Sequence, residues 1–170
     1  SLEICDFCEI ILWYERVSCD RTVCIFVVLS QIKGEKMKNC AVILAGGEGK
    51  RMKSDKPKTL SEVLGKPMLC WVMSALRKAG IDDICVVKGF KKECVEEYLS
   101  TLDFSVESVF QTERLGTGHA VMMAKDFLKK HSGNVVILNG DAPFMDSKTI
   151  EKSLKAHIEN GCAATVISAR

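Results

Sequence analysis

Apolar runs and amphipathic stretches alternate along the chain after residue 37. The short apolar runs predict β-strands at residues 40–45, 84–88, 106–111, 135–139 and 163–168. Between them, apolar residues recur at helical spacing in residues 67–79, 91–99, 117–130 and 147–159. The first of these has the clearest helix signals, because Pro67 opens it and Gly80 follows it. This alternation predicts an α/β fold with a doubly wound, mostly parallel, Rossmann-like sheet.

Residues 1–36 do not continue that alternation. Cys5, Cys8, Cys19 and Cys24 could hold a zinc ion, although the second pair is spaced loosely and no glycine forms a knuckle turn between the pairs. Residues 23–29 are apolar but too few to span a bilayer, and the residues before them are acidic rather than basic as in a signal peptide. Neither targeting interpretation fits.

A further interpretation of residues 1–36 comes from the genetic code. Residues 33–36 (KGEK) can be encoded by a purine-rich stretch that contains AAGGAG, which resembles a bacterial ribosome-binding site. Met37 would then be the initiator, directly before the first predicted strand. We therefore predict that residues 1–36 are a non-native or mistranslated extension and that the domain occupies residues 37–170.

Composition limits the class of protein. A chain of 170 residues can bury a full core, and 47% hydrophobic residues is ordinary for a globular domain. A net charge of +2 gives no reason to expect a nucleic-acid partner, and no apolar run is long enough to cross a membrane. The cysteines beyond residue 37 are scattered through apolar stretches, as reduced thiols of a cytoplasmic protein would be.

The strongest chemical signal is the glycine-rich, basic segment 44–58. Gly46, Gly47 and Gly49 follow an apolar strand, and five basic residues come next: Lys50, Arg51, Lys53, Lys56 and Lys58. Glycines allow backbone N–H groups to approach an anion closely, so this loop is a candidate phosphate cradle. The Walker pattern fails because Arg51 stands where Ser or Thr is needed, and the dinucleotide fingerprint fails at Met52. A solvated surface turn is the simpler alternative.

The loop and two later blocks resemble the sugar-phosphate nucleotidyltransferases. The three blocks, in matching order and spacing, are Leu44-Ala45-Gly46-Gly47-x-Gly49-x-Arg51-Met52, residues 111–120 (QTERLGTGHA) and residues 138–143 (LNGDAP). Within that family the chain is most similar to the pyrophosphorylase domain of the bacterial bifunctional enzymes that make UDP-N-acetylglucosamine. The resemblance runs from about Met37 to the last residue.

The resemblance implies a reaction and its substrates. UTP and N-acetylglucosamine 1-phosphate would give UDP-N-acetylglucosamine, a cell-envelope precursor, and pyrophosphate in the cytoplasm. Because the nucleophile is already an anion, alignment and charge neutralisation are enough, and no nucleophilic side chain is needed. Full-length relatives are trimers through a domain that this sequence does not contain, so acetyl transfer is not expected here.

The resemblance also implies roles for individual residues. Arg51 and Lys58 would stabilise charge in the transition state, and Asp141, at a predicted strand end, would bind Mg²⁺. The remaining positions are nucleotide-binding (Leu44, Ala45, Gly46, Gly47, Gly49, Lys58, Gln111, Gly116 and Thr117) or sugar-binding (Asn139 and Gly140). The alternatives are a solvated arginine at position 51 and a turn residue at position 141. We expect His119 to be structural, because this reaction needs no general base.

Three positions depart from the family pattern. Lys50 stands where threonine is usual, Gly46 where alanine is common, and Asn139 where tyrosine or a small residue is frequent. Asn139 therefore leaves the choice of sugar open. The final third of the family's domain, which supplies sugar contacts and a second metal ligand, does not occur in this sequence. Three alternatives stay open: transfer to another sugar phosphate or to a molybdenum cofactor, an inactive fragment, and a zinc-binding interaction module.

Overall fold

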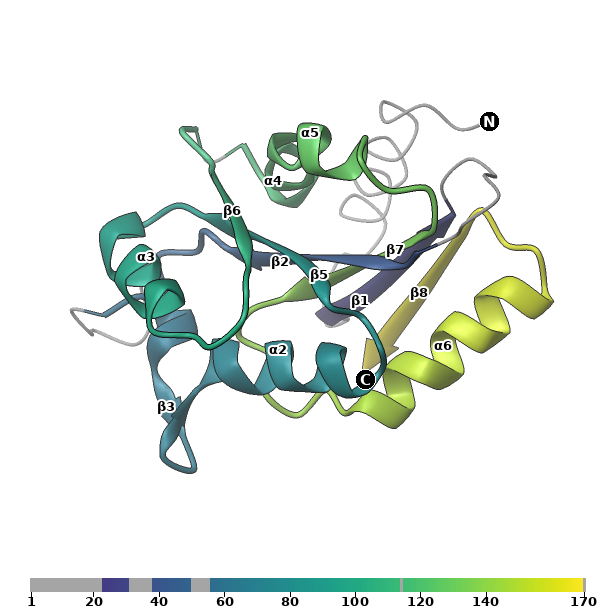
Figure 1. Cartoon of the computed structure of the whole chain (residues 1–170), viewed down its shortest axis with the longest axis horizontal. Coiled ribbons are helices and arrows are strands. Elements are labelled where there is room, and N and C mark those ends of the chain that lie inside the picture. Colours follow the sequence, from purple (N-terminus) through teal and green to yellow (C-terminus); the bar gives the residue numbers. More distant parts are fainter. Residues whose placement is uncertain (1–22, 31–37, 50–55, 114, 170) are drawn as a thin grey trace.

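A six-stranded sheet with helices on both faces forms the body of the protein (Figure 1). The computed structural model describes residues 23–30, 38–49, 56–113 and 115–169. The strands of the sheet lie in the order β6-β5-β2-β7-β1-β8. Their bounds are β1 Val23–Ser30, β2 Cys40–Ala45, β5 Asp83–Lys88, β6 Glu107–Phe110, β7 Asn134–Asn139 and β8 Ala164–Ala169.

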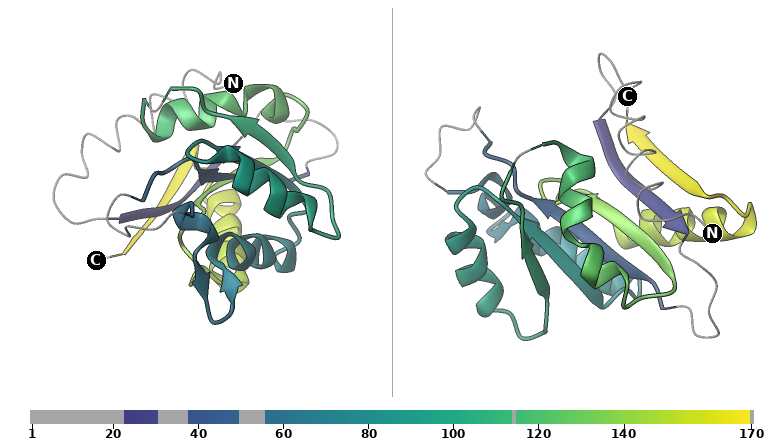
Figure 2. Two further views of the ribbon diagram at one scale, coloured as in Figure 1. Left: turned by 90° about the vertical axis from the view of Figure 1, so that its left-hand side faces the viewer. Right: turned by 90° about the horizontal axis from the view of Figure 1, so that it is seen from above.

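Four neighbouring strands, β6, β5, β2 and β7, run parallel. Both faces of this part are covered, so its strands are almost continuously apolar, as in β2 (CAVILA) and β7 (NVVILN). The helices are α2 Met68–Lys78, α3 Lys92–Ser100, α4 Thr117–Met123, α5 Lys125–Leu128 and α6 Ser147–Glu159. Figures 1 and 2 show α4 and α5 on one side of the sheet and α2 and α6 on the other. The predicted doubly wound α/β fold is confirmed.

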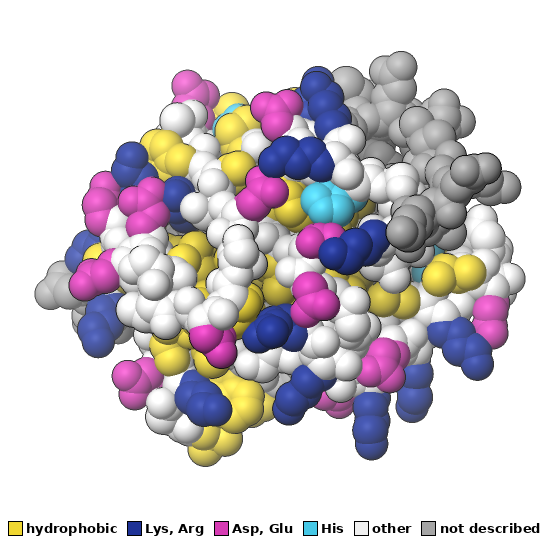
Figure 3. Space-filling view, viewed as in Figure 1, with side chains coloured by type: hydrophobic (Ala, Val, Ile, Leu, Met, Phe, Trp, Pro, Cys, Tyr) yellow, Lys and Arg dark blue, Asp and Glu magenta, His cyan; other side chains and the backbone are white. Residues whose placement is uncertain are grey.

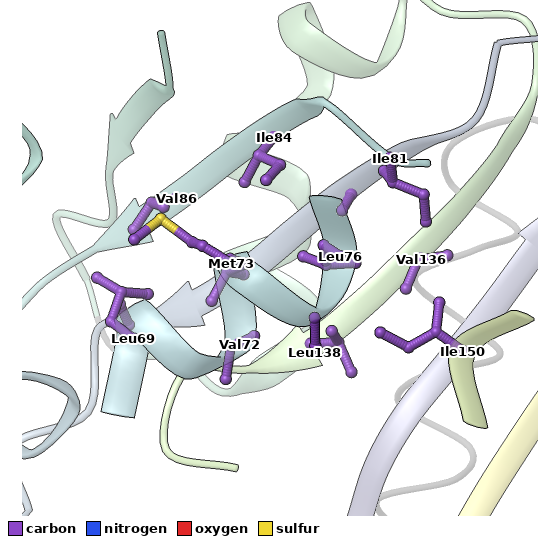
Figure 4. Packing of buried hydrophobic residues seen from close by; sticks show 14 of the residues in the cluster. Leu69, Val72, Met73, Leu76, Ile81, Ile84, Val86, Val136, Leu138 and Ile150 are labelled. Carbon is purple, nitrogen blue, oxygen red and sulfur yellow. The ribbon is translucent and has the colours of Figure 1, made fainter. Parts of the chain in front are cut away.

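The larger hydrophobic core lies between the sheet and helices α2 and α6 (Figure 4). Helix α2 presents Leu69, Val72, Met73 and Leu76 to the strands, all of them 1% exposed or less. Their i, i+3, i+4, i+7 spacing is the reason this segment is helical and lies flat on the sheet. A second core on the opposite face contains Cys40 and Cys85, and burial raises the pKa of each thiol to about 12. These two cysteines are therefore unreactive thiols of the core.

Strand β1 comes from the segment predicted to be an extension, and it lies inside the sheet. It is antiparallel to β7 on one edge, where Phe26 pairs with Leu138, and to β8 on the other, where Val27 pairs with Val166. Strands β7 and β8 therefore point the same way, with α6 connecting them and one strand width between them. The idea that residues 1–36 are a non-native extension stays a prediction.

Two other features differ from the sequence-based expectation. The predicted helix at residues 117–130 is divided into α4 and α5 at Ala124, whose ψ of 9° departs from helical geometry. A small hairpin of β3 (Glu62–Val63) and β4 (Lys66–Pro67) precedes α2 and turns through Leu64 and Gly65, both with positive φ. In the described part of the chain, none of the helices has the length and apolar character needed to cross a bilayer.

Candidate functional site

The loops that follow β2, β5, β6 and β7 meet at one edge of the sheet. Parallel pairing sets Ala45 beside Lys88 and Lys88 beside Phe110, so these strands end at the same level. Backbone bonds then join the loops: Phe90 N–H donates to Gly46 O at 3.2 Å, and Gly140 N–H donates to Leu44 O at 2.9 Å. The carboxyl edge of parallel strands is where open α/β sheets bind ligands.

Gly46 and Gly89 allow two of these loops to approach each other. A β-carbon built on Gly89 would lie 2.8 Å from both Cα and O of Gly46, closer than real β-carbons come to backbone atoms. Gly49 has a φ of +61°, and a β-carbon there would lie 2.8 Å from Lys58 Cβ. Only glycine fits both requirements at Gly49, so the loop is held against the segment that carries Lys58.

Lys58 and Asp141 form an ion pair across the site. Lys58 starts the 3₁₀ turn η2 (Lys58–Leu60), and Asp141 lies two residues beyond the end of β7. Both side chains are about one-third exposed, at 34% and 33%, so water and ligands can reach the pair. A predicted catalytic cation and the predicted metal-binding carboxylate are thus in contact. Arg51, the other predicted cation, lies outside the described residues.

Gln111 occupies a second position at this edge, directly after β6. Its side chain is 6% exposed, and its amide Nε2 lies 3.2 Å from Gly116 O and 3.2 Å from His119 Nδ1. Its Oε1 lies 3.0 Å from the position that a β-carbon on Gly46 would take. Gln111 therefore connects the glycine loop to the start of α4, where Gly116 and Thr117 lie.

The other predicted site residues are placed less directly. Ala45 is fully buried, so a ligand can meet it only through its backbone. Gly47 is exposed, and Asn139 is half-buried at the end of β7. Gly140 is buried against Thr59, whose hydroxyl oxygen has no hydrogen-bond partner in the part of the chain that the structure describes.

The sequence did not indicate Lys88 and Gly89. Lys88 is 7% exposed, and its Nζ lies 2.5 Å from Glu96 Oε1 on α3 and 2.9 Å from Ser108 Oγ on β6. The hydrogen bond from Lys88 lowers the pKa of Glu96. Lys88 thus fixes the end of β5 next to Gly89. A charged residue that ends an apolar run (ICVVK) is the signal that could have pointed to it.

The described residues contain no cluster of three or more His, Cys, Asp or Glu side chains that could enclose a metal ion. Asp141 is a carboxylate at the mouth of the site, which fits Mg²⁺, because this ion keeps several waters and takes phosphate oxygens as ligands. For the proposed zinc set, Cys5, Cys8 and Cys19 lie outside the described residues, and Cys24 is described only as part of the β1 backbone.

Comparisons with known proteins agree with the fold. Residues 41–170 match the family of MobA-like NTP transferase domains. The chain is 49% identical over 133 residues to the bifunctional protein GlmU of Clostridium beijerinckii, and 49% identical over 132 residues to that of Clostridium tetani. Each match covers 78% of this chain but only 29% of the relative.

Solved structures share the fold at low sequence identity. A UDP-glucose pyrophosphorylase from Acinetobacter baumannii superposes with a TM-score of 0.63 at 24% identity, covering 74% of this chain and 54% of that one. A 4-diphosphocytidyl-2C-methyl-D-erythritol synthase from Anaerococcus prevotii gives a TM-score of 0.57 at 21% identity, covering 71% and 50%. At these identities the likeness concerns the fold alone.

Proposed function

Because this chain belongs to the MobA-like NTP transferase family, we propose that it transfers a uridylyl group from UTP to N-acetylglucosamine 1-phosphate. The products would be UDP-N-acetylglucosamine and pyrophosphate. The 49% identity to two GlmU proteins supports this choice within the family, although the chain spans only 29% of their length. We place the reaction in the cytoplasm, among the steps that make cell-envelope precursors.

One observation carries the proposal: a glycine loop, a Lys–Asp pair and a buried glutamine meet at the carboxyl edge of the parallel strands. Lys58 contacts Asp141, and Gln111 Oε1 faces Gly46. Backbone amides that can cradle phosphates, a cation beside them and a polar side chain that can meet the base suit a nucleoside triphosphate. On the face shown in Figure 3, basic and acidic side chains are interspersed among the described residues.

The reaction requires the protein mainly to hold the sugar phosphate and the α-phosphate of UTP in line. A phosphate oxygen of the sugar phosphate attacks the α-phosphorus of UTP, and the bond to the β-phosphate breaks to release pyrophosphate. Backbone amides of residues 46–49 would hold the departing phosphates, while Lys58 would neutralise charge that develops in the transition state. Arg51, on the same loop, is proposed as a second cation.

The ion pair gives Lys58 a definite starting position. Before substrate binds, its ammonium group neutralises Asp141. A phosphate group of the substrate would replace Asp141 as the anion paired with Lys58. The Asp141 carboxylate would then be available. Asp141 would then hold Mg²⁺, which when bound supplies positive charge to the phosphate oxygens. Asn139 and Gly140 are proposed to contact the sugar.

Pyrophosphate release by the whole purified chain tests the proposal. The chain is incubated with Mg²⁺, N-acetylglucosamine 1-phosphate and, separately, UTP, dTTP, CTP or GTP, and UDP-N-acetylglucosamine is identified by mass spectrometry. We expect the highest rate with UTP and no product without the sugar phosphate. A clear preference for GTP, or no pyrophosphate with any triphosphate, would contradict the proposal, and glucose 1-phosphate in a parallel reaction tests the sugar.

A further inference from the structure

The amide group of Gln111 has a single orientation that its surroundings enforce. Gly116 O is a backbone carbonyl and can only accept a hydrogen bond, so the Gln111 atom 3.2 Å away from it must be the nitrogen Nε2. The same nitrogen lies 3.2 Å from His119 Nδ1. Both N–H groups of the amide are therefore engaged, one by the carbonyl and one by the histidine.

This contact requires one tautomer of His119. Nδ1 must accept the hydrogen bond from the Gln111 amide nitrogen, so the ring proton lies on Nε2. Gln111 Oε1 is then the amide atom left to face Gly46, 3.0 Å from where a β-carbon of residue 46 would lie. Glycine at position 46 keeps the space in front of Oε1 open. The site thus presents a hydrogen-bond acceptor, and no donor from Gln111, beside the glycine loop.

We propose that His119 is a positioning residue that sets base preference by holding the Gln111 amide with Oε1 toward the base. This inference rests on the proposed function, in which the nucleotide base contacts Gln111. Uracil and thymine carry a hydrogen on ring N3 and can donate to Oε1. In the same pose, cytosine brings an unprotonated N3, so two acceptors face each other and the pairing is lost. His119, expected from the sequence to be structural only, thereby acts through Gln111 on specificity.

The test compares UTP, dTTP and CTP binding to the whole chain by competition against a fluorescent UTP analogue. In H119L the amide is held only by its bond to Gly116 O, so turning it over costs one hydrogen bond fewer than in the wild type. We expect the ratio of UTP to CTP affinity to fall about three- to tenfold, the loss expected for one neutral hydrogen bond. The ratio of UTP to dTTP affinity should not change, because both bases present the same N3–H.

Two further variants separate positioning from folding. Asn in H119N has an oxygen on Cγ, where His carries Nδ1, so it should restore most of the preference. Gln in H119Q carries its polar atoms one bond farther out and should behave like Leu, which provides a second loss variant if H119L does not fold. H157Q is the matched control, because it replaces a buried histidine that contacts Thr165 on β8 and not Gln111, so both ratios should stay unchanged.

The outcomes separate the role of His119 from the proposed function. A folded H119L or H119Q protein that keeps the wild-type ratio of UTP to CTP overturns the role of His119 while the proposed function stands. An equal fall in all three affinities would mean that His119 supports the fold only, which also overturns the inference. If the wild-type chain binds none of the three nucleotides, the proposed function fails and the inference fails with it.

Discussion

The two parts of the sheet differ in strand direction and in the residues they carry. Strands β6, β5, β2 and β7 are parallel and lie almost wholly within the family match of residues 41–170. The predicted site residues that the structure describes lie on these strands or in the segments that follow them. The antiparallel strand β1 lies outside that match and contributes none of these residues, yet it joins β7 to β8. The chemistry and the completion of the sheet thus depend on different segments of the chain.

This difference predicts two kinds of mutational effect. A change on the parallel side should alter nucleotide binding or turnover, whereas a change at β1 or β8 should act first on stability.

Removal of residues 1–36 should have the largest effect, because it exposes the inner edges of β7 and β8. Register pairs join β1 to both strands, and losing its backbone hydrogen bonds should cost on the order of 5 kcal/mol, comparable with the whole stability of a small domain. We expect a chain that starts at Met37 to unfold or aggregate, as measured by circular dichroism and gel filtration. A chain that starts at Val23 retains β1 and is the matched control.

The same experiment decides the status of the extension. If the chain from Met37 melts at the full-length temperature and binds UTP, β1 is dispensable and the prediction of a non-native extension gains support. The separation between the two parts of the sheet would then have to be abandoned.

Replacing Lys58 should abolish most activity without affecting the fold. K58M removes the cation proposed to stabilise the transition state, and the loss of one such contact typically costs about 10²- to 10³-fold in kcat. Its partly exposed pair with Asp141 contributes little to stability, so the melting temperature should change by no more than about 2 °C. Pyrophosphate release and thermal melting are the measurements. K155M, which breaks an exposed pair with Glu159 on α6, should retain the wild-type rate.

Gly89 should be intolerant of a side chain even though it makes no chemical contribution. G89A drives a methyl group into the backbone of Gly46, and accommodating it should cost roughly 1–3 kcal/mol and weaken UTP binding. In G47A the added β-carbon has no atom within 4 Å among the described contacts, so stability should stay within about 0.5 kcal/mol of the wild type. Equal melting temperatures of the two variants would disprove the close approach of the loops.

The smallest effect concerns His157, on the antiparallel side, where Nδ1 lies 2.9 Å from Thr165 Oγ1 and so connects α6 to β8. Burial lowers the pKa of His157 from its usual 6.5. Below pH 6.5 the unfolded chain therefore binds a proton that the folded chain resists, and stability falls as the pH decreases. Thermal melts from pH 7.5 to 5.5 should show this fall in the wild type and a weaker one in H157Q. UTP affinity should not follow it.

Much of the parallel part could be predicted because its signals are local. The strand at 40–45 and the helix at 147–159 have the predicted bounds, since apolar runs and capping signals lie within each element. Asp146, for example, caps α6 by accepting a hydrogen bond from Thr149 N–H. The glycine loop and the Asp141 loop each follow a predicted strand, and they meet because parallel strands end at one edge of the sheet.

The features that the sequence did not predict depend on contacts between distant residues. The apolar run at 23–29 gave no indication that it would lie between β7 and β8. The division of α4 from α5 at Ala124 has no glycine or proline to mark it. Two contacts depend on the exact placement of separate loops: Lys58 with Asp141, and His119 with Gln111. Residue spacing along the chain does not predict such placement.

The position of β1 also has a consequence for the order of folding during synthesis. β1 is the first described strand to leave the ribosome, yet its partners, β7 and β8, are the last strands described. All the residues up to β7 must be made before β1 can pair, and such long-range contacts form slowly. The apolar segment of β1 therefore stays unpaired while the parallel strands assemble. Such exposed apolar segments in a nascent chain favour aggregation and chaperone binding.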